Sequence, residues 1–151
     1  MKKFNHPIKI EDLQKQVLVE KVTQAINSTE SFTYDFVELA PDVFSIIRKI
    51  NSLHEKTLKL IFSQENLEKL HVRVSSAKGG QFYIFPEQGG LILKSITNHS
   101  YKALQDLLPK YFKHILMNPT TLITPILGAY MMKLNRDGII IPIYFILQRA
   151  I

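Results

Sequence analysis

A hairpin-like stretch, Ser75–Ile96, constrains the fold of this chain more than any other segment. Residues 81–85 are glutamine followed by aromatic and β-branched side chains, a composition typical of a β-strand. Residues 86–90 (Pro-Glu-Gln-Gly-Gly) favour a turn, and residues 91–96 form a second apolar run. The stretch therefore predicts two strands joined by a turn. The small residues of 77–80 (Ala-Lys-Gly-Gly) precede them and would let the backbone approach a ligand closely.

Lys94 is the charged residue of the returning strand, with Leu93 and Ile96 among its apolar neighbours in sequence. An ammonium group is costly to bury unless it meets an anion. Two interpretations stay open from the spacing alone. Lys94 contacts a phosphate, as the lysine beside a kinase ATP lid does, or it lies on the strand face that is open to water.

Composition limits the classes of protein and site. A chain of 151 residues is long enough for one domain with a single core. It has no cysteine, which excludes disulfides, thiolate metal sites and cysteine nucleophiles. The five histidines show no paired ligand spacing, so no metal site is expected. The uncharged run 117–132 is broken by proline and glycine and is too short for a membrane span.

The net charge of +6 is unevenly distributed. Through Glu87 there are 12 basic and 11 acidic residues, whereas from Gln88 onward there are 7 basic and 2 acidic ones. The C-terminal half could therefore face an anionic partner, or it could simply be a solvated basic surface. Basic residues do not alternate with the hairpin aromatics, so packing is preferred over nucleic-acid binding for those rings.

The rest of the chain predicts an α+β fold: an antiparallel sheet of about five strands with one main helix across it. Residues 1–30 are expected to form an extension with an amphipathic helix over 11–26, and 31–151 the domain proper. Within the domain, helices are expected at 42–50, 52–62 and from Thr97, Asn98 or Ser100 to 117, and extended segments at 32–36, 67–74, 122–132 and 139–147. Pro109 should kink or divide the last helix.

Seven short motifs occur in order along the chain: 34–36 (Tyr-Asp-Phe), 40–44 (Ala-Pro-Asp-Val-Phe), 78–83 (Lys-Gly-Gly-Gln-Phe-Tyr), 91–95 (Leu-Ile-Leu-Lys-Ser), 107–114 (Leu-Leu-Pro-Lys-Tyr-Phe-Lys-His), 118–123 (Asn-Pro-Thr-Thr-Leu-Ile) and 128–130 (Gly-Ala-Tyr). In this order and spacing they resemble the catalytic core of the phosphatidylinositol phosphate kinases. The resemblance implies the small lobe of that core. By it, Lys94 matches the ATP-binding lysine, and Lys78, Gly79 and Gly80 match the glycine loop. Residues 140–147 match the strand that enters the hinge beside the adenine ring, and residues 148–151 the hinge.

Two departures from the family pattern shape the expected function. The sequence ends where the hinge is expected, so the lobe with the catalytic aspartate and metal-binding acidic residue is not expected here. Loop and helix residues also differ, since Ala77, Gln81 and Lys110 replace a glycine, a serine and an acidic residue of the pattern. We therefore expect a pseudokinase with no catalytic residue, no metal and no required cofactor, although ATP could be bound without turnover.

The expected role is a non-catalytic accessory subunit that contacts other protein subunits of a large assembly. One alternative is the nucleotide- or phosphoinositide-binding half of a split lipid kinase. Another is a peripheral membrane module that touches anionic lipid through Lys102, Lys110, Lys113 and Lys133. The expected location is intracellular, in a membrane-associated assembly such as one of the mitochondrial inner membrane, or at the cytoplasmic face of a membrane.

Overall fold

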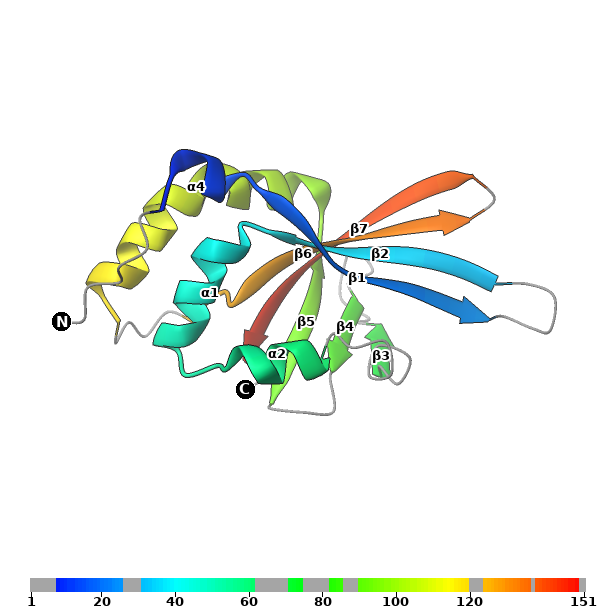
Figure 1. The fold of residues 1–151 in the computed structure, drawn as a ribbon, viewed down its shortest axis with the longest axis horizontal. Coiled ribbons are helices and arrows are strands. Elements are labelled where there is room, and N and C mark those ends of the chain that lie inside the picture. Colours follow the sequence, from blue (N-terminus) through cyan, green and yellow to red (C-terminus); the bar gives the residue numbers. More distant parts are fainter. Residues whose placement is uncertain are drawn as a thin grey trace.

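A seven-stranded antiparallel sheet forms the centre of the molecule, with strand order β1-β2-β6-β7-β5-β4-β3. The computed structural model describes residues 8–25, 31–61, 71–74, 82–85, 90–119, 124–136 and 138–149 (Figure 1). The strands are β1 (Gln16–Ala25), β2 (Ser31–Leu39), β3 (His71–Val74), β4 (Phe82–Phe85), β5 (Leu91–Ile96), β6 (Gly128–Arg136) and β7 (Ile139–Arg149). The helices are η1 (Ile10–Leu13), α1 (Pro41–Ile50), α2 (Glu55–Ile61) and α4 (Asn98–Met117). The α+β class, the antiparallel sheet and the main helix are confirmed, and the sheet is wider than expected.

The N-terminal segment departs from the prediction. It forms the short 3₁₀-helix η1 and then the edge strand β1, which pairs with β2 from Gln16 opposite Leu39 to Ala25 opposite Ser31. The amphipathic helix expected over 11–26 was therefore wrong. Three valines and a threonine within β1 favour the extended backbone, and pairing with β2 supplies the hydrogen bonds that a helix would have made internally. The register shifts between Leu18 and Glu20, which marks a β-bulge or a similar irregularity.

Helix α1 begins and ends as its sequence predicts. Pro41 occupies a first-turn position that needs no backbone N–H, and Asp42 places a negative charge in the same turn. At the other end Ser52 adopts a left-handed backbone with φ +61°, while the N–H of Leu53 donates to the carbonyl of Arg48 at 2.9 Å. This bond closes the helix in the manner of a Schellman motif. The chain then turns into α2, so both predicted helices are confirmed.

Helix α4 is one continuous element from Asn98 to Met117. Of the three candidate N-caps, Thr97 takes the role, since its side chain accepts a hydrogen bond from the N–H of Ser100 at 3.0 Å. Pro109 lies inside the helix and does not divide it. Pro109 is exposed on α4.

The core lies between the sheet and helices α1 and α4 (Figure 1). Phe36 of β2 sits at its centre, with its ring centroid 5.5 Å from that of Tyr130 and 6.4 Å from that of Phe145. The β1–β2 and β6–β7 ribbons project beyond these helices (Figure 1). The β6–β7 connection is tight, because Arg136 pairs with Ile139 and Gly138 adopts φ +80°, as a two-residue hairpin turn requires.

Tyr101 carries a buried hydroxyl with no hydrogen-bond partner among the described residues. The centroid of its ring lies 4.6 Å from the ring centroid of Tyr144. Burial raises the pKa of Tyr101 to about 12 from its usual value near 10. We expect Tyr101→Phe to raise the free energy of unfolding by about 1 kcal/mol at pH 8, because an unsatisfied buried hydroxyl is removed. Ionisation favours the unfolded chain between pH 10 and 12, so the stability from protonated Tyr101 is lost as pH rises through that interval.

Urea titrations at pH 8 and pH 11 measure both effects. The fall in stability between the two pH values should be smaller in Tyr101→Phe than in the parent protein. Tyr111→Phe is the control, because the hydroxyl of Tyr111 accepts a hydrogen bond from the N–H of Ile126 at 2.6 Å. That variant should be less stable than the parent at pH 8. Equal destabilisation by the two substitutions would contradict the prediction.

Candidate functional site

Lys94 lies in the middle of β5, between β4 and β7. Along this strand Leu91, Leu93 and Ser95 are buried, whereas Lys94 is half-buried on the opposite face. It pairs through the backbone with Tyr83 of β4 and with Ile146 of β7. In the described part of the chain its ammonium group forms no ion pair. The backbone at Lys94 is therefore paired on both sides within the sheet.

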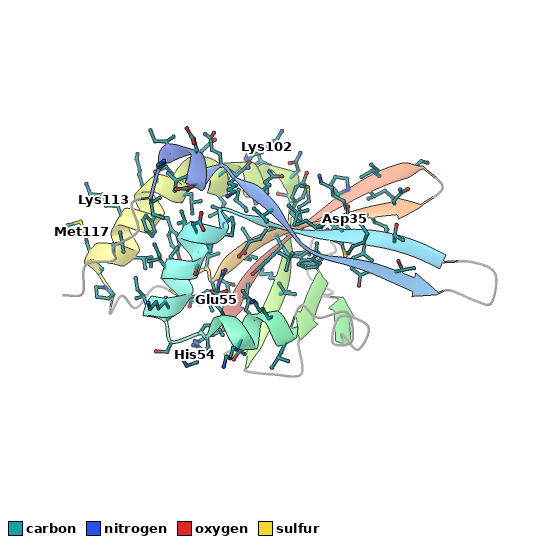
Figure 2. All side chains as sticks on the ribbon, in the orientation of Figure 1. Asp35, His54, Glu55, Lys102, Lys113 and Met117 are labelled. Carbon is teal, nitrogen blue, oxygen red and sulfur yellow. The ribbon has the colours of Figure 1, made fainter. Side chains whose placement is uncertain are left out.

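The other residues predicted for the site, Lys78, Gly79 and Gly80, lie outside the described residues. The hairpin that follows them is confirmed, because Tyr83 pairs with Lys94 and Ile84 with Leu93. Of the lysines proposed for lipid contact, Lys102, Lys110, Lys113 and Lys133 are all exposed. Figure 2 shows Lys102 and Lys113 on the outer side of α4, away from the core.

A buried cluster of charges lies at the C-terminal end of α1. Arg48 is only 1% exposed, and its Nη1 donates to Oε2 of Glu38 at 2.6 Å. Its Nε donates to Oε1 of Glu55 at 3.1 Å, so Arg48 joins β2 and α2 to α1. Glu38 is buried as well, whereas the side chain of Glu55 is 48% exposed. The guanidinium thus has one buried carboxylate partner, Glu38, and one half-exposed partner, Glu55.

Burial is the largest influence on the pKa of Glu38 and on that of Tyr130. It raises the pKa of Glu38, although the neighbouring Arg48 opposes the change. Tyr130 lies opposite Glu38 in the β2–β6 pair. Burial raises the pKa of Tyr130 well above its ordinary value, and the carboxylate of Glu38 raises it further. Tyr130 therefore stays protonated beside the ion pair.

The end of β7 is bonded to the same corner of the molecule. Arg149, whose neighbourhood was expected to be the hinge, donates from Nη2 to the carbonyl of Asn51 at 2.7 Å. Arg48 donates from Nη1 to the carbonyl of Leu127 at 3.0 Å, and the N–H of Leu127 donates to the carbonyl of Leu147 at 2.7 Å. The α1–α2 corner is therefore attached to β7 at two points.

A cleft of about 420 Å³ opens at this corner. It is lined by Ser45, Lys49, Ser52, Leu53, His54 and Glu55. Glu55 belongs both to the cleft and to the Arg48 cluster, and Figure 2 shows it with His54 at the junction of α1 and α2. No three histidine, aspartate or glutamate side chains gather into a metal-binding group among the residues that the structure describes.

The Arg48 cluster was not predicted from the sequence. On α1 the structure buries Val43, Phe44, Ile47 and Arg48. A signal was present, because Arg48 follows Phe44 by four residues and so shares its face of the helix. A charge on that face needs a buried partner, and Glu38 stands in an otherwise apolar part of β2.

Length and apolar character determine whether a helix could cross a membrane. Among the helices in the described ranges, none combines the length and the apolar character that crossing a bilayer demands.

Comparison with known proteins gives a consistent result. The family model for phosphatidylinositol-4-phosphate 5-kinase matches residues 62–151, which is more than half of the chain. A phosphatidylinositol 4-phosphate 5-kinase of Plasmodium falciparum is 28% identical over 146 residues, or 91% of this chain. The kinase its3 of Schizosaccharomyces pombe, described in the same words, is 32% identical over 108 residues, or 70% of the chain. A putative phosphatidylinositol 4-phosphate 5-kinase 11 of Arabidopsis thaliana is 27% identical over 101 residues, or 66%.

These relatives are much longer proteins. The chain spans 8%, 14% and 24% of their respective lengths. The resemblance inferred from the seven motifs is confirmed, since the matched region includes the hairpin, Lys94, α4 and the β6–β7 pair. The chain therefore belongs to the phosphatidylinositol-4-phosphate 5-kinase family.

Proposed function

We propose that this chain is the nucleotide-binding part of a kinase that acts on phosphatidylinositol 4-phosphate, with Lys94 contacting the phosphates of ATP. The position of Lys94 is the observation that carries the proposal. Lys94 is half-buried on β5, and its ammonium has no carboxylate partner among the described residues. A phosphate group would supply the missing opposite charge.

The sheet gives Lys94 a fixed base from which to bind. β5 pairs with β4 on one side and with β7 on the other, so the backbone at Lys94 has little freedom to move. The same hairpin follows the Lys78-Gly79-Gly80 sequence, which lacks bulky side chains at two of three positions. Two adjacent glycines in this sequence would allow close approach of a phosphate to the backbone.

Phosphoryl transfer also needs metal-binding and hydroxyl-orienting groups, and residues 1–151 supply few candidates for them. Metal ions must neutralise the phosphates, and a residue must orient the attacking hydroxyl. After Lys94 the only acidic residues are Asp106, which is exposed on α4, and Asp137, which lies outside the described residues. We propose that the metal-binding and catalytic groups come from outside residues 1–151, on the same or another polypeptide.

The proposal is tested by calorimetric titration of the folded chain with MgATP. The parent protein should bind, and Lys94→Ala should weaken binding at least about tenfold, because a charge-assisted contact with phosphate is removed. Lys102→Ala is the matched control, since it removes one exposed lysine from α4 and the same unit of charge. It should bind as the parent does.

Two results would count against the proposal. Failure of the folded parent protein to bind MgATP at millimolar concentration would exclude a nucleotide-binding role for the isolated chain. Equal weakening by Lys94→Ala and Lys102→Ala would show that net charge, rather than a site at β5, attracts the nucleotide.

A non-catalytic accessory role is the second candidate, and one surface favours it. Ile139, Ile140 and Ile141 are exposed in succession at the start of β7, on the ribbon that projects beyond the helices (Figure 1). Exposed apolar patches often mark contacts between proteins. Co-purification of the tagged chain with defined subunits, lost when the three isoleucines are replaced by threonine, would favour this role. Unchanged co-purification would remove its structural support.

A further inference from the structure

A single residue, Leu127, connects the buried guanidinium of Arg48 to strand β7 through its carbonyl and its N–H. Arg48 Nη1 donates to the carbonyl oxygen of Leu127 at 3.0 Å, and the N–H of the same residue donates to the carbonyl of Leu147 at 2.7 Å. Leu147 pairs with Leu93, the residue before Lys94 on β5. The orientation of Arg48 is thus transmitted through two hydrogen bonds to the strand beside the proposed nucleotide lysine.

The orientation of the Arg48 guanidinium is itself fixed by its two carboxylate partners. Glu38 accepts from Nη1 at 2.6 Å and Glu55 accepts from Nε at 3.1 Å. Because a guanidinium is planar and its donors form a rigid fork, holding these two nitrogens also fixes the angle at which Nη1 meets Leu127. A lysine ammonium at this position could replace the charge but could not satisfy all three acceptors in that plane.

A second bond attaches the same corner to the end of β7. Arg149 Nη2 donates to the carbonyl of Asn51 at 2.7 Å, three residues after Arg48. Residues 147 and 149 are thus both bonded, directly or through Leu127, to the C-terminal end of α1. The last part of β7 is held against α1 as well as within the sheet.

We propose that Arg48 is a positioning residue, which keeps the end of β7, and through it Lys94, in the geometry that binds nucleotide. The proposal rests on the proposed function of Lys94. Glu55 is the adjustable member of the cluster, because its carboxylate is 48% exposed and lines the cleft between α1 and α2. A change at Glu55 alters the orientation of Arg48 and so reaches the nucleotide site without contacting it.

The test uses the full chain and the variant Arg48→Lys, which keeps the positive charge opposite Glu38 but loses the planar fork. Two quantities are measured: the hydrogen-exchange rate of the Leu127 amide and the affinity for MgATP. We expect the Leu127 amide to exchange at least about tenfold faster and MgATP to bind about 3- to 30-fold more weakly. Ile115→Val is the control, since it removes one methylene-sized group from the buried face of α4 and leaves the hydrogen-bonded path intact. It should change neither quantity.

Glu55→Gln is a milder second variant, because a half-exposed carboxylate is replaced by an amide of the same shape. It should move both quantities in the same direction as Arg48→Lys, with at least a twofold loss of affinity, and it keeps the test usable if Arg48→Lys does not fold.

The outcomes separate the two proposals. One outcome is that the folded parent protein binds MgATP and that both variants, Glu55→Gln and Arg48→Lys, bind it with the same affinity as the parent. In that case the positioning role is overturned while the role of Lys94 stands. If the parent protein does not bind MgATP, the nucleotide site fails and the positioning role fails with it. If Ile115→Val weakens binding as much as Arg48→Lys, the effect is one of general stability and the positioning role is again overturned.

Discussion

Replacing Arg48 with methionine should lower the free energy of unfolding by about 3 to 5 kcal/mol, because the change leaves a buried carboxylate without its counter-charge. Glu38 is 6% exposed and receives its 2.6 Å hydrogen bond from Arg48. The carbonyl of Leu127 would also lose the side-chain donor it now has at 3.0 Å. Methionine has a similar length, so the loss should come from charge and hydrogen bonding rather than from an empty volume.

Chemical denaturation of the parent protein, Arg48→Met and the double variant Glu38→Gln/Arg48→Met measures this effect. The double variant should recover part of the loss, because an amide is far less costly to leave in that position than a carboxylate. A loss below about 1 kcal/mol for Arg48→Met would show that water reaches Glu38 and that the pair behaves as a surface ion pair.

Gly128→Ala should lower the free energy of unfolding by about 1 to 3 kcal/mol, because the added methyl group overlaps a fixed aromatic ring. A Cβ at this position would lie 2.6 Å from the hydroxyl oxygen of Tyr130 and 2.7 Å from its Cε2. Tyr130 cannot retreat easily, since it is fully buried and packs against Phe36. The ring also borders Glu38, so its displacement would disturb the Arg48 cluster.

A double-mutant cycle with Tyr130→Leu identifies the cause. If the clash with the ring is responsible, Gly128→Ala should cost much less in the Tyr130→Leu background than in the parent protein. An equal cost in both backgrounds would place the strain in the backbone of β6 instead. Thermal unfolding monitored by circular dichroism is sufficient, since the expected difference in stability corresponds to several degrees in the midpoint temperature of unfolding.

Local patterns were sufficient to predict the hairpin and the main helix. The β4–β5 pair is specified by aromatic and β-branched runs on either side of the proline- and glycine-rich sequence 86–90. Helix α4 repeats its apolar side chains at helical spacing, and it buries Tyr101, Leu104, Leu108 and Ile115. Both elements contain the information for their own formation, and Lys94 could be placed on its strand for that reason.

β1 could not be predicted in the same way, because its stability comes from its partner. Its described side chains from Gln16 to Val19 are all exposed. This part of β1 therefore lacks the alternation of buried and exposed residues that usually identifies a strand. Pairing with β2 over nearly its whole length makes it a strand. The β-branched residues of β1 were the available signal for a strand.

The Arg48 cluster depends on residues that are distant in sequence. Glu38, Arg48 and Glu55 come from three elements, and Leu127 joins them from 79 positions after Arg48. Spacing rules within one helix indicate that Arg48 faces inward, but they do not identify the carboxylate that meets it. Only the packing of α1 on the sheet brings the four residues together.

The irregularity in β1 has a consequence for how the molecule behaves at high concentration. Val17, Leu18 and Val19 form an exposed apolar run on an edge strand, the kind of segment that recruits other chains into aggregates. The register with β2 breaks between Leu18 and Glu20, at the end of that run, and two charged residues, Glu20 and Lys21, come next. The regular strand geometry at the outer edge is thus interrupted next to the apolar side chains that would favour pairing with another chain. The same feature that disturbs β1 therefore protects the sheet against growth from its edge.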